Sequence, residues 1–344
     1  MSTIKKYLKR YFVDAMGAMA QGLFASLLIG TIFGTLSDLI FGVGADSFLK
    51  EISGYASAAS GMAIGVAVAY KLGADPLVLF SCAAVGSIGY SYPTYFEAID
   101  RNLTAGPAGA FFAVIVAAEL TMLVSKKTKV DILVTPVTAL LSGYLTSFLI
   151  CPAVSYLMYY LGKFINTATE YQPFVMGIIV SVVVGIILTL PISSAAICAM
   201  IGITGLAGGA ATVGCCAQMV GFAVISFREN RWGGIVSQGL GTSMLQMGNI
   251  CKKPIIWLPP IIASAICGPL STLVFKLECT GVSAGMGTCG MVGPIGVISA
   301  SAHKPLTYIG LVLCCIVIPA AVSLIISEIM RKAKLISYGD LALD

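Results

Sequence analysis

Long apolar runs recur along the whole of this chain, and most of them are long enough to cross a lipid bilayer as helices. The hydrocarbon core is about 30 Å thick, which roughly 20 helical residues span. Only 10% of the 344 residues are charged, whereas soluble domains carry about 25%. The sequence therefore predicts an all-α polytopic membrane protein, organised as a single membrane-embedded domain over residues 1–344. It argues against a soluble enzyme and against a partner nucleic acid.

The apolar segments differ in length and composition. Three are short and rich in Gly, Ser or Thr, namely 192–206, 233–250 and 283–301. Irregular backbone at membrane depth persists only where protein buries it or where it lines a cavity. We therefore expect about ten crossings plus re-entrant or broken segments around a site. The remaining predicted segments are 16–43, 53–71, 76–92, 105–125, 131–162, 174–190, 208–227, 254–276 and 305–330.

Basic residues gather near both ends of the sequence, and they predict its topology. Lys5, Lys6, Lys9 and Arg10 precede the first span, whereas Arg331, Lys332 and Lys334 follow the last. Cytoplasmic loops of membrane proteins carry an excess of Lys and Arg. Both termini are therefore expected in the cytoplasm, which requires an even number of crossings.

Similar patterns recur in the two halves in the same order. Gly22, Ser26 and Gly30 share their spacing with Gly177, Ser181 and Gly185, and further matches follow downstream. This predicts two repeated units, approximately 16–165 and 174–276, followed by a hairpin and a helix over 279–330. Five crossings per unit, an odd number, would invert the second unit relative to the first in the membrane. A re-entrant segment in place of one crossing would give both units the same orientation. Duplicated halves are frequent in transporters, where substrate binds between them.

The eleven cysteines predict neither a disulfide framework nor a metal site. Most lie inside apolar runs, and two pairs are vicinal, Cys215-Cys216 and Cys314-Cys315. Adjacent positions on a helix are poor disulfide geometry, and buried free cysteine acts as a small apolar packing residue. We expect no metal and no cofactor.

Glycine is concentrated in two stretches, 202–221 and 281–296. Small residues let membrane helices approach closely, which is a sufficient explanation for Gly61, Gly65, Gly86 and Gly89. Six glycines and a proline within 281–296 cost too much helix propensity for a simple span. This stretch is therefore predicted to be a re-entrant loop whose backbone groups face a polar cavity.

Polar residues inside apolar segments are the candidate solute ligands. An ionisable group within a membrane is costly and so indicates function, although Glu119 has the alternatives of an interfacial position or a structural hydrogen bond. His303, the only histidine, lies at a span boundary, where an ordinary interfacial role is the alternative to a relay. Amide side chains suit a polyhydroxylated ligand because they both donate and accept hydrogen bonds. The predicted solute-binding residues are Gln218, Gln246, Asn249, Ser193, Ser194, Thr288, Gly285, Gly287, Glu119 and His303.

Three stretches resemble one membrane family: GVSAGMGTCGMVGPIG, KKPIIWLPPIIASAICGPLST and AGGAATVGCCAQMVGFAV. The chain resembles the second enzyme IIC family of the bacterial phosphoenolpyruvate-dependent sugar phosphotransferase system, in the branch named after the perfringolysin O regulator. The resemblance implies a dimeric sugar permease of the bacterial inner membrane that passes substrate to a cytoplasmic IIB protein. No IIA or IIB domain is fused to this sequence, so those phosphocarriers are expected to be separate chains.

Three functions compete at this point. A transporter of a sugar or similar polar solute, working by alternating access, accounts for the duplication, the broken Gly-rich segments and the embedded amides. A membrane sensor that binds a solute without moving it would need an output surface, which the short loops do not offer. A membrane-embedded enzyme would need a nucleophile and a base, and no catalytic residues are evident. We favour the transporter.

Overall fold

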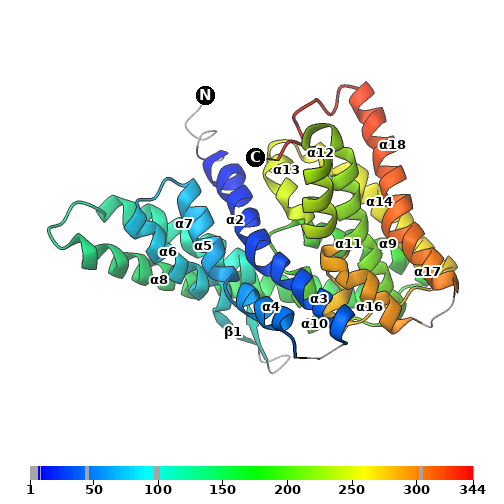
Figure 1. Ribbon diagram of the computed structural model, residues 1–344, viewed down its shortest axis with the longest axis horizontal. Coiled ribbons are helices and arrows are strands. Elements are labelled where there is room, and N and C mark those ends of the chain that lie inside the picture. The colour runs from blue at the N-terminus through cyan, green and yellow to red at the C-terminus, as the bar shows by residue number, and fades with distance from the viewer. Residues whose placement is uncertain (1–6, 8, 43–45, 97–100, 302–304, 344) are drawn as a thin grey trace. The chain divides into compact units, whose positions relative to one another are not determined.

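The computed structural model describes residues 7, 9–42, 46–96, 101–301 and 305–343 (Figure 1). The chain forms two compact units. Unit 1 comprises residues 1–30 and 46–158, and unit 2 comprises residues 31–45 and 159–344. The second unit thus includes the hairpin and helix that the sequence placed after the two predicted repeats.

The first unit is built from closely packed helices. Glycines allow this packing: a Cβ atom on Gly61 would lie 2.8 Å from the carbonyl oxygen of Gly86, and one on Gly89 would lie 2.6 Å from that of Gly109. Its elements are η1 (Arg10–Ala15), α2 (Met16–Leu23), η2 (Phe24–Leu28), the first two residues of α3 (Ile29–Phe41), α4 (Phe48–Ala58), α5 (Ser60–Lys71), α6 (Pro76–Ser91), β1 (Pro93–Phe96), β2 (Arg101–Thr104), α7 (Gly106–Val124) and most of α8 (Asp131–Ala168). Helices α3 and α8 continue into residues of the second unit.

Over the residues that the structure describes, one short pair of strands interrupts the helices. Strands β1 and β2 pair antiparallel, with Pro93 opposite Thr104 and Phe96 opposite Arg101. The sequence predicted only a polar connection here. Thr, Tyr and Phe favour strands, and pairing two such stretches satisfies the backbone groups of a connection that is too short for a helix pair.

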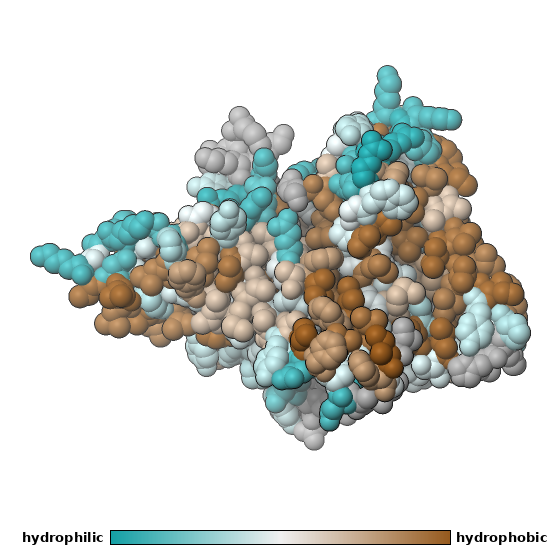
Figure 2. Space-filling view, in the orientation of Figure 1, coloured by the Kyte–Doolittle hydropathy of each residue, from teal (hydrophilic) through white to brown (hydrophobic). Residues whose placement is uncertain are grey.

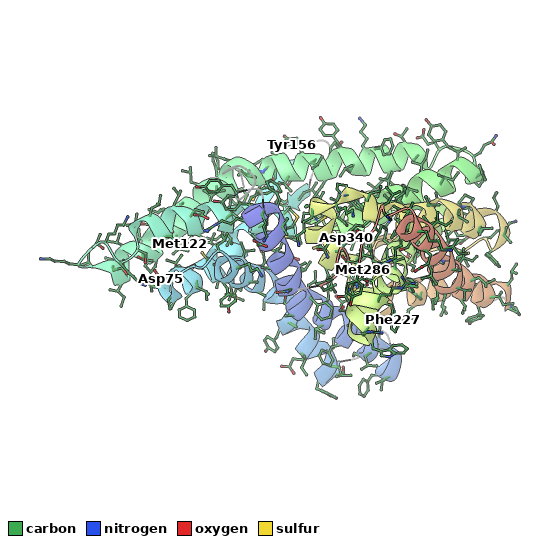
Figure 3. The ribbon with its side chains drawn as sticks, turned by 90° about the horizontal axis from the view of Figure 1, so that it is seen from above. Asp75, Met122, Tyr156, Phe227, Met286 and Asp340 are labelled. Carbon is green, nitrogen blue, oxygen red and sulfur yellow. The ribbon has the colours of Figure 1, made fainter. Side chains whose placement is uncertain are left out.

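Helix α8 is longer than the predicted span of 131–162. It runs for 38 residues through Pro136 and Pro152, which corresponds to about 57 Å and exceeds the thickness of the hydrocarbon core. Many of its apolar side chains are exposed, for example Leu141 by 67% and Leu149 by 65%. Figure 3 shows this helix with Tyr156 labelled. An exposed apolar surface on a membrane helix suits contact with lipid.

Helix α11 forms the core of the second unit, surrounded by α9, α14 and α18 (Figure 1). Of its most apolar 18-residue stretch, 94% is buried. The elements of this unit are α9 (Pro173–Thr189), α10 (Ser194–Met200), α11 (Gly205–Ile225), α12 (Phe227–Val236), η4 (Ser237–Gly241), η5 (Ser243–Gln246), α13 (Met247–Lys252), η6 (Pro254–Trp257), α14 (Leu258–Pro269), η7 (Leu270–Val274), α15 (Gly281–Ala284), η8 (Cys289–Met291), α16 (Val292–Ala300), α17 (Pro305–Val312), η9 (Leu313–Val317) and α18 (Ile318–Lys332).

The structure confirms a helical membrane protein and the three broken segments. Over the described residues, six helices are long and apolar enough to cross a membrane, or seven if α4 and α5, bent by 48°, count as one span. Three shorter apolar helices accompany them. Figure 2 shows apolar residues over the side of unit 2 formed by α17 and α18, with hydrophilic residues beyond the end of α18. The total of ten crossings stays a prediction.

The two Gly–Ser–Gly patterns both mediate close packing, but they contact helices that do not correspond in the predicted repeat. Gly22 lies against Ala63 of α5, whereas Gly177 lies against Gly268 of α14. In the predicted repeat, Ser57-Ala58-Ala59, directly before α5, matches Ser194-Ala195-Ala196 of α10, and Pro136 and Gly143 of α8 match Pro260 and Gly268 of α14. These contacts give the duplication no support, and superposition of the two units is the direct test of it.

Candidate functional site

Two re-entrant segments approach α11 from its opposite ends. The first re-entrant segment, residues 227–252, begins where α11 ends. Its Gln238 Nε2 donates to Ser226 Oγ (2.8 Å), and a Cβ atom on Gly239 would lie 3.6 Å from Ala223 Cβ. Helix α12, a π-helical turn and a 3₁₀ turn replace a continuous helix here. The segment therefore turns back close to the C-terminal end of α11.

The second re-entrant segment, residues 277–301, is anchored at the N-terminal end of α11. The N–H groups of Cys279 and Gly281 donate to the carbonyls of Gly205 (3.2 Å) and Ile203 (2.9 Å). The two ends of the segment are joined as well, because Ser301 Oγ accepts from Glu278 N (2.9 Å) and donates to Glu278 O (3.1 Å). This is the geometry of a hairpin that enters the unit and returns to the same end.

The tips of the two re-entrant segments meet beside the C-terminal half of α11. Thr288 Oγ1 donates to the carbonyl of Gly239 and lies 3.5 Å from Met219 Sδ. On the neighbouring α10, Ser194 Oγ donates to the carbonyl of Gly285 (2.7 Å). These bonds join the Gly-rich loop to the first segment and to α10.

Glycine is required at the tip for two reasons. Gly287 has a φ of +55°, which is unfavourable for other residues. A Cβ atom there would also lie 2.8 Å from the Cβ of Cys215 on α11. The tip can therefore touch α11 only because this side chain is missing.

The tips bring together neutral hydrogen-bonding groups. Thr288 is 3% exposed and Ser194 4%. At the end of α9, the hydroxyl of Thr189 lies 2.8 Å from that of Ser243, and both residues are fully buried. These hydroxyls bond to one another and to carbonyls, and among the described residues their partners are uncharged. Among the described residues, no group of three or more His, Cys, Asp or Glu is placed to bind a metal.

A comparison with known protein families assigns the chain to one of them. The family model described as "Phosphotransferase system, EIIC" matches residues 13–343. The chain belongs to this EIIC family. It is thus a multi-pass membrane component of the sugar phosphotransferase system, as the resemblance implied.

The other comparisons are less informative about this EIIC protein. No curated protein matches its sequence. A structure search finds the crystal structure of the transporter ChbC, the IIC component from the N,N'-diacetylchitobiose-specific phosphotransferase system. That match covers 96% of this chain and 98% of ChbC at 13% identity, with a TM-score of 0.33.

Five of the predicted ligands of this EIIC protein lie at the candidate site formed by the tips and α10, or next to it. Ser194, Gly285, Gly287 and Thr288 are at or next to the contacts between the tips, α10 and α11. Ser193 caps α10 by accepting from Ala196 N (3.2 Å). Thr189, Gly239 and Ser243 also lie at the tips, and the sequence pattern did not indicate them. The Gly- and Thr-rich composition of 233–250 was the available signal.

Gln218 bonds to side chains of neighbouring helices and not to groups at the tips. Its Oε1 accepts from Trp257 Nε1 (3.0 Å), and its Nε2 donates to Ser264 Oγ (3.3 Å). Its Cγ lies on the side of α11 that faces Gly185 of α9. The amide therefore links α11 to α14 and η6, where a buried polar group needs such partners.

Gln246 and Asn249 bind a segment of the same chain. Gln246 Nε2 donates to the carbonyl of Leu341 (2.9 Å), and Asn249 Nδ2 donates to that of Ala342 (2.7 Å). Asn249 Nδ2 also donates to Gln246 Oε1 (2.9 Å). These amides therefore already have protein partners, which the sequence pattern did not indicate.

Of the two ionisable candidates, only Glu119 lies among the described residues. Glu119 belongs to unit 1, where its Oε1 accepts from Arg10 Nη2 (2.7 Å) and from the hydroxyl of Tyr11 (3.1 Å). This corresponds to the structural alternative that the sequence left open. His303 lies outside the described residues.

Proposed function

We propose that this EIIC protein transports a sugar or a similar small polar solute by alternating access, with the solute bound where the two re-entrant tips meet. The observation that carries this proposal is the hydrogen bond from Thr288 to the carbonyl of Gly239. It joins two segments of broken helix that start from opposite ends of one buried helix. Discontinuous helices that meet inside a bundle are the usual binding sites of secondary transporters.

The chemistry of the tips suits a neutral polyol. The hydroxyls of Thr288, Ser194 and Ser243 bond to protein groups in this conformation. A sugar hydroxyl can replace each such partner, because it both donates and accepts, whereas a lipid tail cannot. A direct hydrogen bond of this kind contributes on the order of 0.5–1.5 kcal/mol. Exchange of bonds within the protein for bonds to the solute would therefore let the tips separate at small net cost.

Substitution of Thr288 by valine tests the binding site. Valine has nearly the same shape but cannot donate to Gly239 or to a solute. We therefore expect the solute to bind roughly threefold to tenfold more weakly. Binding and uptake of radiolabelled monosaccharides and disaccharides would be measured in proteoliposomes, with and without added IIA and IIB proteins. Thr167→Val is the matched control, because Thr167 is exposed and bonds only within its own helix. Unchanged affinity and uptake in a folded Thr288→Val protein would contradict the site.

A disulfide between the tips tests alternating access. Gly239→Cys and Thr288→Cys place cysteines at positions whose backbones are adjacent, because Thr288 Oγ1 donates to the Gly239 carbonyl. We expect oxidation to abolish uptake and a reductant to restore it, since the tips could no longer separate. The single Thr288→Cys variant, oxidised in the same way, is the control. Full uptake by the cross-linked protein would show that transport needs no separation of these tips.

We propose that the end of unit 2 at which α11 ends and α12 begins faces the cytoplasm and the phosphocarrier proteins. Arg228, Lys253 and Arg331 lie on elements that join at this end, and positive residues favour the cytoplasmic side. We also propose that both termini lie in the cytoplasm of a bacterial cell, as the basic residues near each end of the sequence predict, with separate IIA and IIB proteins and a homodimer as the expected assembly. No described contact favours the alternative of a regulator without transport.

A further inference from the structure

Residues 337–343, here called the strap, lie on a set of side chains that bind their backbone. Asn230 Nδ2 donates to the carbonyl of Leu341 (2.8 Å), and the N–H of Leu343 donates to Asn230 Oδ1 (2.8 Å). Gln246 and Asn249 donate to the carbonyls of Leu341 and Ala342. The N–H of Gly339 donates to Glu229 Oε1 (3.4 Å). Figure 3 views unit 2 from this end, with Asp340 labelled.

We propose that Glu229, Asn230, Gln246, Asn249 and Lys253 form a binding site for a peptide in a turn conformation, and that the strap is its detachable ligand. These five residues are called the strap site below. Nothing in the established role of an EIIC protein requires such a site.

The contacts are those of peptide recognition. Four backbone groups of the strap between Gly339 and Leu343 are bound by side chains of the strap site. The strap itself is a turn, in which the N–H groups of Asp340 and Ala342 donate to the carbonyls of Ser337 and Gly339 (both 3.2 Å), so the site recognises the main chain of a turn. Leu341 is the apolar anchor, since it is fully buried. Asp340 pairs with Lys253 Nζ (2.7 Å), whereas the Tyr338 side chain is 76% exposed. The ligand class is therefore a peptide with an acidic residue followed by leucine.

The charges around Asp340 favour its ionised form. Partial burial by itself raises the pKa of this carboxyl. Hydrogen bonds from Lys253 and from the Ser337 N–H, together with the charges of Lys253 and Arg331, more than offset this effect, so its pKa lies below the ordinary value. The ion pair therefore supports docking at neutral pH.

The strap is held by contacts that can be reversed. One buried leucine, one ion pair and a few hydrogen bonds have to offset the ordering of seven residues, and these opposing contributions are of similar size. The strap site also contains backbone strain next to Asn230. Arg231 has a φ of +53° and a ψ of −147°, a region that only glycine occupies readily. Two hydrogen bonds between Asn230 and the strap, one donated and one accepted by its amide, help to hold this turn.

The strap site is connected to the re-entrant tips. Gln246 Nε2 donates to Gln238 Oε1 (3.0 Å) as well as to the strap. Gln238 belongs to η4, and the next residue, Gly239, accepts the hydrogen bond from Thr288. An effect of the strap on transport rests on the proposed function, whereas peptide binding does not.

Peptide binding can be measured on the full chain in nanodiscs. Cys251, next to the strap site on α13, is the exposed one of the eleven cysteines, so a maleimide fluorophore can be attached there. Leu341→Asp places a charge at a fully buried position and should release the strap. A synthetic peptide with the sequence of residues 336–343 should then bind the variant saturably and restore the wild-type fluorescence. Tyr338→Ala, which changes an exposed side chain, is the matched control and should behave as wild type.

Three comparisons decide the result. The peptide should have little effect on the wild-type protein, whose strap site is occupied, and the same peptide carrying Leu341→Asp should not bind. Asn230→Ala in the Leu341→Asp background should weaken peptide binding by about tenfold, because it removes two hydrogen bonds. A folded Leu341→Asp protein that keeps wild-type fluorescence, or that binds neither peptide, would overturn the proposal.

A second design covers the case in which Leu341→Asp does not fold. A protease site inserted between Lys334 and Leu335 of the wild-type sequence allows the strap to be cut after folding. An excess of labelled peptide should replace the cut strap within hours, whereas permanent retention of the strap would show that it is a fixed structural element. Uptake measured before and after this exchange would then report whether the strap acts on the re-entrant tips.

Discussion

Replacement of Glu229 by glutamine is expected to lower the free energy of unfolding of unit 2 by about 3–5 kcal/mol. Glu229 pairs with Arg331 at 2.9 Å and 3.2 Å, and the exposures of the two side chains are 1% and 9%. Glutamine would leave the Arg331 guanidinium buried without a counter-charge. The energetic cost comes from that unpaired charge, not from the loss of one hydrogen bond. Thermal unfolding of the purified protein in detergent measures the change.

An exposed ion pair on the same helices provides the control for this prediction. Arg228 and Glu328 also join α12 to α18, but their side chains are 58% and 34% exposed. Solvent screens such pairs, so Glu328→Gln is expected to cost at most about 1 kcal/mol. Equal effects of Glu229→Gln and Glu328→Gln would contradict the role given to burial.

Valine at position 209 is expected to destabilise the protein by at least 1–3 kcal/mol, roughly the cost of overpacking a close contact. A Cβ atom on Gly209 would overlap the carbonyl oxygen of Leu277. Backbone would have to move at the point where α11 crosses the start of the second re-entrant segment. The anchoring bonds from Cys279 to Gly205 and from Gly281 to Ile203 lie beside this contact. We therefore expect less folded protein and a lower midpoint of thermal unfolding.

Alanine at position 54 is the matched change at a glycine without such a neighbour. A Cβ atom on Gly54, inside α4, would meet nothing within 4 Å. Glycine in a helix is less favourable than alanine by roughly 0.5–1 kcal/mol, so Gly54→Ala should leave stability unchanged or raise it slightly. If Gly209→Val expresses and unfolds like wild type, α11 is not anchored at this crossing.

The partners of the predicted amide ligands could not be read from the sequence. Gln218, Gln246 and Asn249 are predicted to bind the solute because amides both donate and accept hydrogen bonds, and this stays a prediction; in the structure each of them bonds to a protein group. Their partners come from far along the chain, as with Asn249 and Ala342. A buried amide bonded to a protein carbonyl and one bonded to a sugar have the same local sequence. Only the three-dimensional arrangement separates the two, and here it favours the strap.

The sequence by itself determined that this protein lies in a membrane and where its helices break. Both follow from local chemistry: apolar runs must form helices in lipid, and Gly-rich stretches such as 281–296 cannot continue one. The tertiary structure alone decided which breaks meet, because Thr288 and Gly239 come together only through the packing of both segments on α11. It also decided the fate of residues 337–343, since a single leucine and a few backbone hydrogen bonds leave no periodic signal in a sequence.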